Sequence, residues 1–254
     1  MLSWFVLKCD FHLHSLEDPR DVLSHDARQL VNHAAELHYD VLALTLHSRL
    51  YCPQELRDYA KTRGILMIPG VEHYLERVEV LLLGVEEMNL KSLNRFDDLR
   101  SLRKERGDDL LVIAPHPFYV LGQCAGEKLA AYPDVFDAVE FCHFYTSWWN
   151  PNRRADEVAQ QIGKPMIACS DTHQLKWMRN HYSLVDAQPT QAGVFAAIRA
   201  GRVQNVSRPL GSLEFFGKAL WHLGMNDPLK IARKWGWISP PSSNGEISRN
   251  TSDG

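Results

Sequence analysis

Short runs of apolar and β-branched residues alternate with amphipathic stretches along most of the chain. The apolar runs predict strands, which we place at residues 4–11, 41–45, 65–71, 78–83, 111–114, 138–141 and 166–169. The amphipathic stretches predict helices at residues 27–37, 54–63, 90–106, 153–162 and 192–200. Strands and helices that alternate in this way are typical of parallel βαβ units.

The number and spacing of these units favour an α/β fold, a TIM-like barrel, over a sandwich or a helix bundle. A doubly wound open sheet is the structural alternative. After Pro209 the alternation stops, and helices are expected at 213–223 and 228–235. We therefore predict a barrel domain over residues 1–210, a helical extension over 211–238 and a disordered tail over 239–254, where Ile247 is the only aliphatic residue.

The composition is that of a soluble globular protein. Of the 254 residues 45% are hydrophobic and 23% are charged, and the net charge is −3, which disfavours a broad nucleic-acid-binding surface. No apolar run approaches the roughly 20 residues that span a bilayer, and Lys8 and Asp10 follow the apolar N-terminal run too soon for a signal peptide. The five cysteines are an odd number and contain no CxxC pair, so we expect free thiols. Together these features lead us to expect a cytoplasmic protein that does not associate with a membrane.

The 12 histidines decide where the chemistry is expected. Chemistry in parallel α/β folds collects at the carboxyl ends of the strands. Six of the predicted strands end close to histidine, aspartate or glutamate: His12, His14, His47, Glu72, His116, His143, Asp171 and His173. Residues two apart on an extended chain point the same way, so both members of a pair such as His12 and His14 can reach one site.

Histidine, aspartate and glutamate together form a nitrogen and oxygen ligand set that suits zinc, manganese or iron. A carboxylate such as Glu72 can bridge two metals, as two-metal phosphoesterases require. A purely structural role would bury many polar groups, each needing a hydrogen-bond partner. Ser170 and Ser15 lack the context of a nucleophile elbow, Cys169 lies in an apolar strand, and the chain has no phosphate-binding glycine loop.

Five motifs resemble, in order, those of the PHP (polymerase and histidinol phosphatase) superfamily: Asp10-Phe11-His12-Leu13-His14-Ser15, Thr45-Leu46-His47, Pro69-Gly70-Val71-Glu72, Ala114-Pro115-His116-Pro117 and Ser170-Asp171-Thr172-His173. The resemblance covers about residues 7–205. It implies a distorted (β/α)7 barrel with two or three divalent metal ions and phosphoesterase chemistry.

The resemblance also implies which residues bind each metal. His12, His14, Glu72 and Asp171 would hold the first metal, and Glu72 and His116 would contribute to the second. The third would be held by His47 and His173, with an acidic or histidine residue from the loop after the first motif, where we prefer Asp21 to Asp18.

Two positions depart from the family pattern. Leu46 stands where relatives place a polar neighbour of the following histidine, and the strand at 78–83 has Val80 and Leu81 where relatives often place a histidine ligand. One ligand of the second metal is therefore missing, and we hypothesise that His143 replaces it.

The resulting expectation is a metal-dependent phosphatase or phosphoesterase that uses a metal-activated water. Asp171 and His173 are the expected catalytic residues, with His173 or His47 protonating the leaving oxygen. Arg49 is the favoured phosphate contact, with Arg20 or Arg153 as further candidates. The expected partner is a small phosphorylated substrate, such as a histidinol-phosphate-like ester or a nucleotide phosphate, and nucleic acid is possible but not favoured.

Two alternatives remain open. The first is a non-catalytic PHP-like module with a degenerate metal site, which Leu46 and the missing strand histidine favour. The second is hydrolysis in the manner of the amidohydrolases. That class commonly uses a bridging lysine, whereas Lys164 precedes its strand and no lysine ends one.

Overall fold

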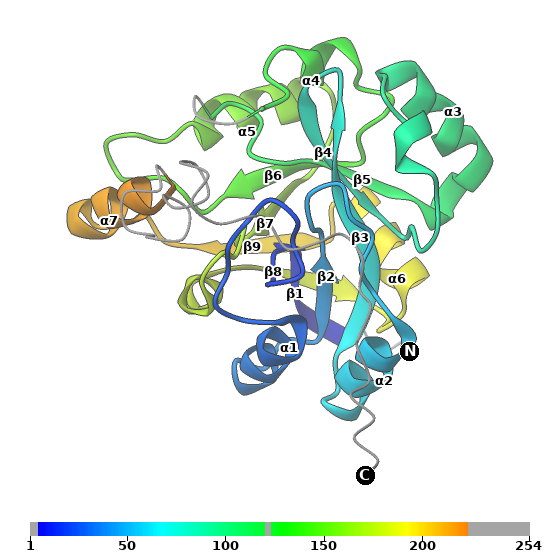
Figure 1. Cartoon of the computed structure of the whole chain (residues 1–254). Helices are drawn as coiled ribbons and strands as arrows, with labels where there is room; N and C mark the ends of the chain where they lie inside the picture. The colour runs from blue at the N-terminus through cyan, green and yellow to red at the C-terminus, as the bar shows by residue number, and fades with distance from the viewer. Residues whose placement is uncertain (1–4, 120–122, 223–254) are drawn as a thin grey trace, which may run out of the picture.

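The computed structural model describes residues 5–119 and 123–222, in which nine strands form one mixed sheet (Figure 1). In sheet order these are β7 (Met166–Cys169), β6 (Ala138–Cys142), β5 (Leu111–Ala114), β4 (Val78–Leu83), β3 (Leu66–Leu75), β2 (Val41–Leu44), β1 (Phe5–Leu13), β8 (His181–Ala187) and β9 (Val203–Ser207).

The sheet curls until its two ends meet, and side chains join them. Asn205 Oδ1 accepts from the backbone N–H of Ala168 at 2.8 Å, and Asn205 Nδ2 donates to the carbonyl of Met166 at 3.0 Å. Ser183 Oγ also accepts from Ala168 N–H, at 2.8 Å. The result is a nearly closed, distorted TIM-like barrel, as the sequence predicted, and not the open doubly wound sheet.

The parallel pattern typical of βαβ units is interrupted at two places in the sheet. Strand β4 runs antiparallel to β3 and β5, and β8 runs antiparallel to β1 and β9. Glu76 and Arg77 link β3 to β4 with positive φ angles of 49° and 70°, a tight hairpin turn that leaves no room for a crossover helix. We did not foresee β8 and β9, because every second residue of β8 is only half-buried and its pattern is less apolar.

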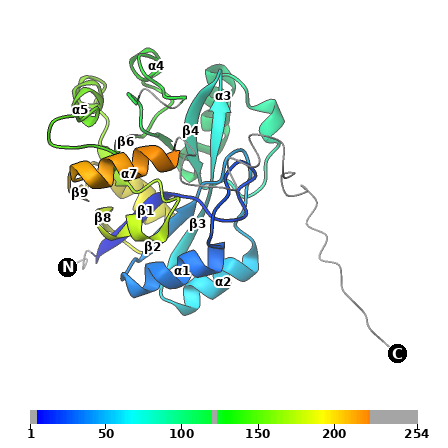
Figure 2. The same ribbon diagram turned by 60° about the vertical axis from the view of Figure 1, so that its left-hand side comes forward.

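Seven α-helices surround the sheet in the described residues: α1 (Ala27–Glu36), α2 (Gln54–Thr62), α3 (Phe96–Arg106), α4 (Lys128–Ala131), α5 (Asn152–Gln161), α6 (Gln191–Arg199) and α7 (Ser212–His222). Figures 1 and 2 show α1 and α2 on one side of the barrel and α3, α4 and α5 on the other.

The helix expected at 90–106 is broken into a 3₁₀ turn, Leu90–Ser92, and α3. The carboxylate of Asp98 accepts from the backbone N–H groups of Asn94 and Arg95 at 3.0 and 2.8 Å. These bonds start a new helix after Arg95, because they satisfy N–H groups that an uninterrupted helix would use internally.

An apolar cluster fills the barrel interior with inward-facing side chains from β1 to β8. Phe195 and Ile198 of α6 belong to the same cluster. A second cluster packs α3 and α5 against the outer face of β3 to β6, and a third packs α1 and α2 against β2. The interior is therefore apolar on the side that α6 covers.

Three further expectations concern the chain as a whole. The helix expected at 228–235 and the tail at 239–254 lie outside the described residues, whereas α7 corresponds to the helix expected at 213–223. All five cysteines are free, as expected. Within the described residues, no helix has both the length and the apolarity needed to cross a membrane.

Asp137, just before β6, is expected to be a main electrostatic support of the fold. Its buried carboxylate accepts from Arg103 at 2.6 and 2.8 Å, from Arg199 at 3.1 Å and from the Val112 N–H at 2.8 Å. Asp137→Ala would leave these donors without their acceptor. We expect urea denaturation at pH 7 to show a loss of about 3–5 kcal/mol in the free energy of unfolding.

The matched control is Asp134→Ala, which removes a half-exposed carboxylate that pairs with Arg100 and should cost much less. Burial would raise the pKa of Asp137, but the hydrogen bonds and charge of Arg103 hold that pKa below its ordinary value. The stabilisation is thus present above pH of about 4 and lost as pH falls through the lowered pKa. Equal losses in the two variants would contradict this role.

Candidate metal centre

Backbone hydrogen bonds between the ends of β1 and β7 bring two of the predicted motifs together. The N–H of His14 donates to the carbonyl of Thr172, and the N–H of Thr172 donates to the carbonyl of His12, each at 3.2 Å. His12 and His14 consequently lie beside Asp171.

A similar bridge joins the end of β2 to β3. The N–H of Glu72 donates to the carbonyl of Leu46 at 3.2 Å, and the N–H of Ser48 donates to the carbonyl of Glu72 at 2.7 Å. His47, which lies between Leu46 and Ser48 in the sequence, is therefore next to Glu72. Leu46 is fully buried in the cluster with α1 and α2, which explains why an apolar residue is accommodated there.

A register shift in β1 turns the two histidines inward. Cys9 and Phe11 belong to the interior cluster, whereas Leu13 packs with α1 on the outside. The pairing of β1 with β2 shifts between Asp10 and Leu13, and such irregularities re-aim side chains. His12 and His14, on either side of Leu13, accordingly face the interior above the apolar cluster.

Four ligand atoms converge at this place, and the four distances between their nitrogens and oxygens suit ligands that share one metal ion. His12 Nε2 lies 3.4 Å from Glu72 Oε2 and 3.5 Å from Asp171 Oδ1. His14 Nε2 lies 3.4 Å from each of the same two oxygens. In a tetrahedron with metal–ligand bonds of about 2.1 Å, neighbouring ligand atoms are about 3.4 Å apart.

The hydrogen bonding of these atoms supports the same interpretation. His12 Nε2, His14 Nε2 and both carboxylate oxygens of Glu72 are buried, yet none makes a hydrogen bond with any described residue. Buried polar atoms in proteins are ordinarily satisfied. A divalent cation would give these atoms a common partner, so the donor set fits a metal ion.

The other oxygen of Glu72 faces a second group of candidate ligands. His116 Nε2 lies 3.6 Å from Glu72 Oε1 and 3.7 Å from Glu79 Oε2. Glu79 is buried on β4 and accepts a hydrogen bond from the hydroxyl of Tyr74. We missed Glu79 in the sequence by looking for a histidine, although a lone carboxylate in an apolar strand was a usable signal.

A third group, on the side of the β1–α1 loop, consists of His14, Asp18, Asp21 and His47, with ligand atoms within 4.8 Å of one another. Asp18 Oδ2 lies 3.0 Å from Nδ1 of both His14 and His47, which orients the two rings. Asp21 Oδ2 instead lies 2.7 Å from His173 Nε2. Asp21 therefore contacts His173, whereas Asp18 contacts the Nδ1 atoms of the His14 and His47 rings.

The structure does not bring His143 or Arg49 into these groups. His143 lies just past the end of β6, outside the candidate ligand groups of the described residues. The His143 ring lies 5.4 Å from that of Trp177 instead. Arg49 is exposed and donates to the carbonyl of Glu17 at 2.7 Å.

Glu140 is a further residue that the sequence analysis missed. It is fully buried, and its Oε2 lies 2.9 Å from His12 Nδ1. A carboxylate in this position fixes the ring and leaves the opposite nitrogen, Nε2, free to bind a metal.

The charges of the cluster shift the affinity of its groups for protons. Burial alone would lower the pKa of His12, but the carboxylates of Asp171 and Glu72 raise that pKa well above its ordinary value. Burial would likewise lower the pKa of His47, but the carboxylates of Glu72 and Asp18 raise that pKa to about 9. A metal that binds near neutral pH must therefore displace protons from these rings.

Two of the candidate ligands have unusual backbone angles. His116 has φ of 29° and Asp171 has φ of 45°, a region that residues other than glycine seldom occupy. Such strain often accompanies functional sites.

Comparison with solved structures shows which fold this is. A two-domain protein from Bacteroides vulgatus, described as containing a predicted PHP-like metal-dependent phosphoesterase, has a TM-score of 0.58 at 18% identity, over 84% of this chain and 69% of that one. PsfC from Pseudomonas syringae has a TM-score of 0.54 at 15% identity, over 86% and 97%. The lesion-specific endonuclease PfuEndoQ from Pyrococcus furiosus has a TM-score of 0.53 at 16% identity, over 79% and 58%.

At such identities these likenesses show a shared fold. Residues 149–203 also match a family model described as PHP-associated, PHP_C. The match and the shared fold support the PHP superfamily. A search of curated proteins found no match. Both findings agree with the motifs at the strand ends.

Glu140→Gln tests whether the carboxylate behind His12 tunes metal affinity. The amide keeps the shape of the side chain but no longer carries the charge that favours the required tautomer. We expect affinity for Zn²⁺ or Mn²⁺, measured by calorimetry, to fall about 10- to 100-fold. Glu157→Gln, on the exposed face of α5, is the control, and unchanged affinity in Glu140→Gln would contradict the role.

The raised pKa values of His12 and His47 predict a pH-dependent metal affinity. Below the folded-state pKa the rings carry protons that the metal must displace. Affinity should thus rise about tenfold per pH unit for each proton displaced, from pH 6 towards the pKa of about 9 of His47. Calorimetry in buffers of different ionisation enthalpy would count the released protons, and a flat profile between pH 6 and 8 would rule the prediction out.

Proposed function

We propose that this protein is a metal-dependent phosphoesterase that hydrolyses a small phosphate ester, of the histidinol-phosphate type or a nucleotide phosphate. The observation that carries the proposal is the group of four converging ligand atoms of His12, His14, Glu72 and Asp171. The PHP-like phosphoesterase named for the Bacteroides vulgatus structure supports this class of reaction.

We assign ligands to three neighbouring positions. His12, His14, Glu72 and Asp171 would hold the first metal. The second oxygen of Glu72 would contribute to a second metal with His116, and Glu79 takes the role for which His143 had been the candidate. His47, His173 and Asp21 would hold a third. Divalent metals at such a cluster supply a water of lowered pKa and positive charge for the phosphate oxygens.

His173 is placed to handle the proton of the leaving group. Its Nε2 lies 2.7 Å from Asp21 Oδ2, and its Nδ1 lies 3.0 Å from the carbonyl of Asp171. Burial would lower the pKa of His173, but Asp171 and Asp21 raise it well above its ordinary value. When it is not a metal ligand, the ring is therefore an imidazolium that can donate a proton to the departing oxygen.

Arg49 remains our candidate for a contact to the phosphate. Its exposed guanidinium is held near the β1–α1 loop by its bond to the carbonyl of Glu17. A guanidinium can form two parallel hydrogen bonds with a phosphate.

The test is to measure bound metals by mass spectrometry and to assay an aryl phosphate with added Mn²⁺ or Zn²⁺. We expect two or more metal ions per chain. Asp171→Ala should reduce turnover by about 10³-fold or more, because it removes a ligand of the first metal. Asp156→Ala, on the exposed face of α5, is the matched control.

The outcomes separate the enzyme from its main alternative. Metal binding without turnover on a panel of phosphate monoesters and diesters would favour a non-catalytic metal-binding module. Turnover that survives in Asp171→Ala would reject the assigned site.

A further inference from the structure

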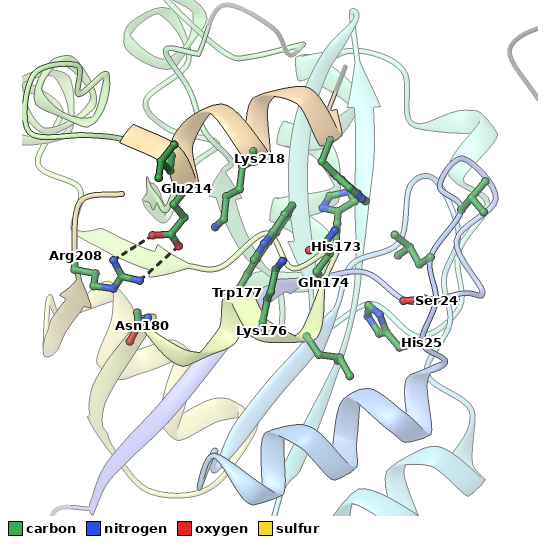
Figure 3. A pocket seen from close by; sticks show the side chains of 16 residues that line it. Ser24, His25, His173, Gln174, Lys176, Trp177, Asn180, Arg208, Glu214 and Lys218 are labelled. Atoms are coloured by element: carbon green, nitrogen blue, oxygen red, sulfur yellow. Dashed lines mark hydrogen bonds and ion pairs between the residues drawn. The ribbon is translucent and has the colours of Figure 1, made fainter. Parts of the chain in front are cut away.

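A large cavity lies next to the proposed catalytic cluster, between α7, the β1–α1 loop and the 3₁₀ turn Leu175–Arg179 (Figure 3). Its volume is about 850 Å³, which is ample for a small organic ligand. His173 lines the cavity and also contacts Asp21 and Asp171. The cavity and the cluster therefore share a wall.

The cavity has more positive than negative side chains. Lys176, Arg208 and Lys218 line it together with one carboxylate, Glu214. Arg208 lies 3.2 Å from Glu214, and Figure 3 shows this pair on one side of the cavity. Among the described residues that line the cavity, the one carboxylate is thus already paired with a cation.

Lys218 is the unusual member of this group. Its side chain is only 7% exposed, and it makes no hydrogen bond or ion pair with any described residue. Figure 3 shows it projecting from α7 into the cavity. Burial lowers the pKa of Lys218 to about 8, so the group still carries its charge at neutral pH.

Contact with an aromatic ring does not by itself explain such a lysine. The ammonium of Lys218 lies 4.4 Å from the centre of the Trp177 ring. Lys8 packs in the same manner on Tyr39, at 4.3 Å, but it also donates to the carbonyl of Leu37 at 2.7 Å. Among the described residues the ammonium of Lys218 has no such acceptor, and an anionic ligand would stabilise its charge at the end of a largely buried side chain.

One part of the cavity wall is apolar. Trp177 and Trp221 are buried, with ring centres 5.2 Å apart, and Leu23 packs against them. The Trp221 ring lies 5.3 Å from that of His173. An apolar surface therefore extends from His173 along the same cavity that Lys218 enters.

We propose that this cavity binds a second anionic group of the substrate, and that Lys218 contacts that group. The substrate would then be a phosphate ester that carries a further carboxylate or phosphate beyond an apolar spacer. The spacer would lie along Trp177 and Trp221 while the ester to be cleaved lies at the metal cluster. This inference rests on the proposed function, because it places the scissile phosphate at that cluster.

The test measures binding of non-hydrolysable phosphonates to the metal-loaded protein, so it does not depend on turnover. Linear ω-carboxyalkyl phosphonates and α,ω-alkane diphosphonates of increasing length are compared with alkyl phosphonates of equal length, by calorimetry. The length series finds the span between the two anion sites, and the two series distinguish a carboxylate from a phosphate. We expect one range of lengths to bind about 10- to 100-fold more tightly than the matched alkyl phosphonate.

The variants then assign this preference to one side chain. Lys218→Met should abolish the preference, Lys218→Arg should retain most of it, and Lys61→Met, on the exposed face of α2, should leave it unchanged. Circular dichroism checks that each variant is folded. If Lys218→Met does not fold, the ligand comparison on the unmodified protein still decides whether a second anion is recognised.

Two results would overturn the inference: equal affinity for both kinds of ligand at every length, or a preference that survives in Lys218→Met. Either can occur while the protein hydrolyses aryl phosphates, in which case the proposed function stands without the second site. Absence of hydrolysis with an intact, Lys218-dependent preference would reject the proposed function and keep the anion site.

Discussion

The burial of histidines and carboxylates above the apolar cluster of the barrel interior is the constraint on which the rest of this structure depends. The interior of the barrel is apolar where α6 covers it and becomes polar at the carboxyl ends of the strands. Glu72 and the facing nitrogens of His12 and His14 are shielded from water without hydrogen bonds to described residues. Burying such groups without partners costs free energy, and a cation shared between them would offset that cost.

Much of the fold and part of the site could be predicted because strands and their polar ends are local features of the sequence. His116 and Asp171 each lie two residues after an apolar run, and parallel strands bring their ends together wherever the helices lie. Glu79 and Glu140 escaped notice because they lie within strands. Each occupies an inward position two residues from a core residue, Leu81 and Ala138 respectively, so their direction emerges only once the inward face is known.

Other features depend on turns and irregularities that apolar periodicity does not encode. The positive φ angles of Glu76 and Arg77 reverse β4, and the shift after Asp10 in β1 turns His12 towards the interior. A one-residue change of register moves a side chain to the opposite face. His143 also follows a strand, but its ring lies against Trp177 and not in the candidate ligand groups.

The seam where the sheet closes gives the metal cluster a mechanical consequence. Between β7 and the β8–β9 ribbon, Ser183 and Asn205 hold the edges together through side chains. His14 follows β1 on one side of that seam, and Asp171 follows β7 on the other. A cation bound by both would connect the two sides of the seam, so metal binding would also tighten the barrel.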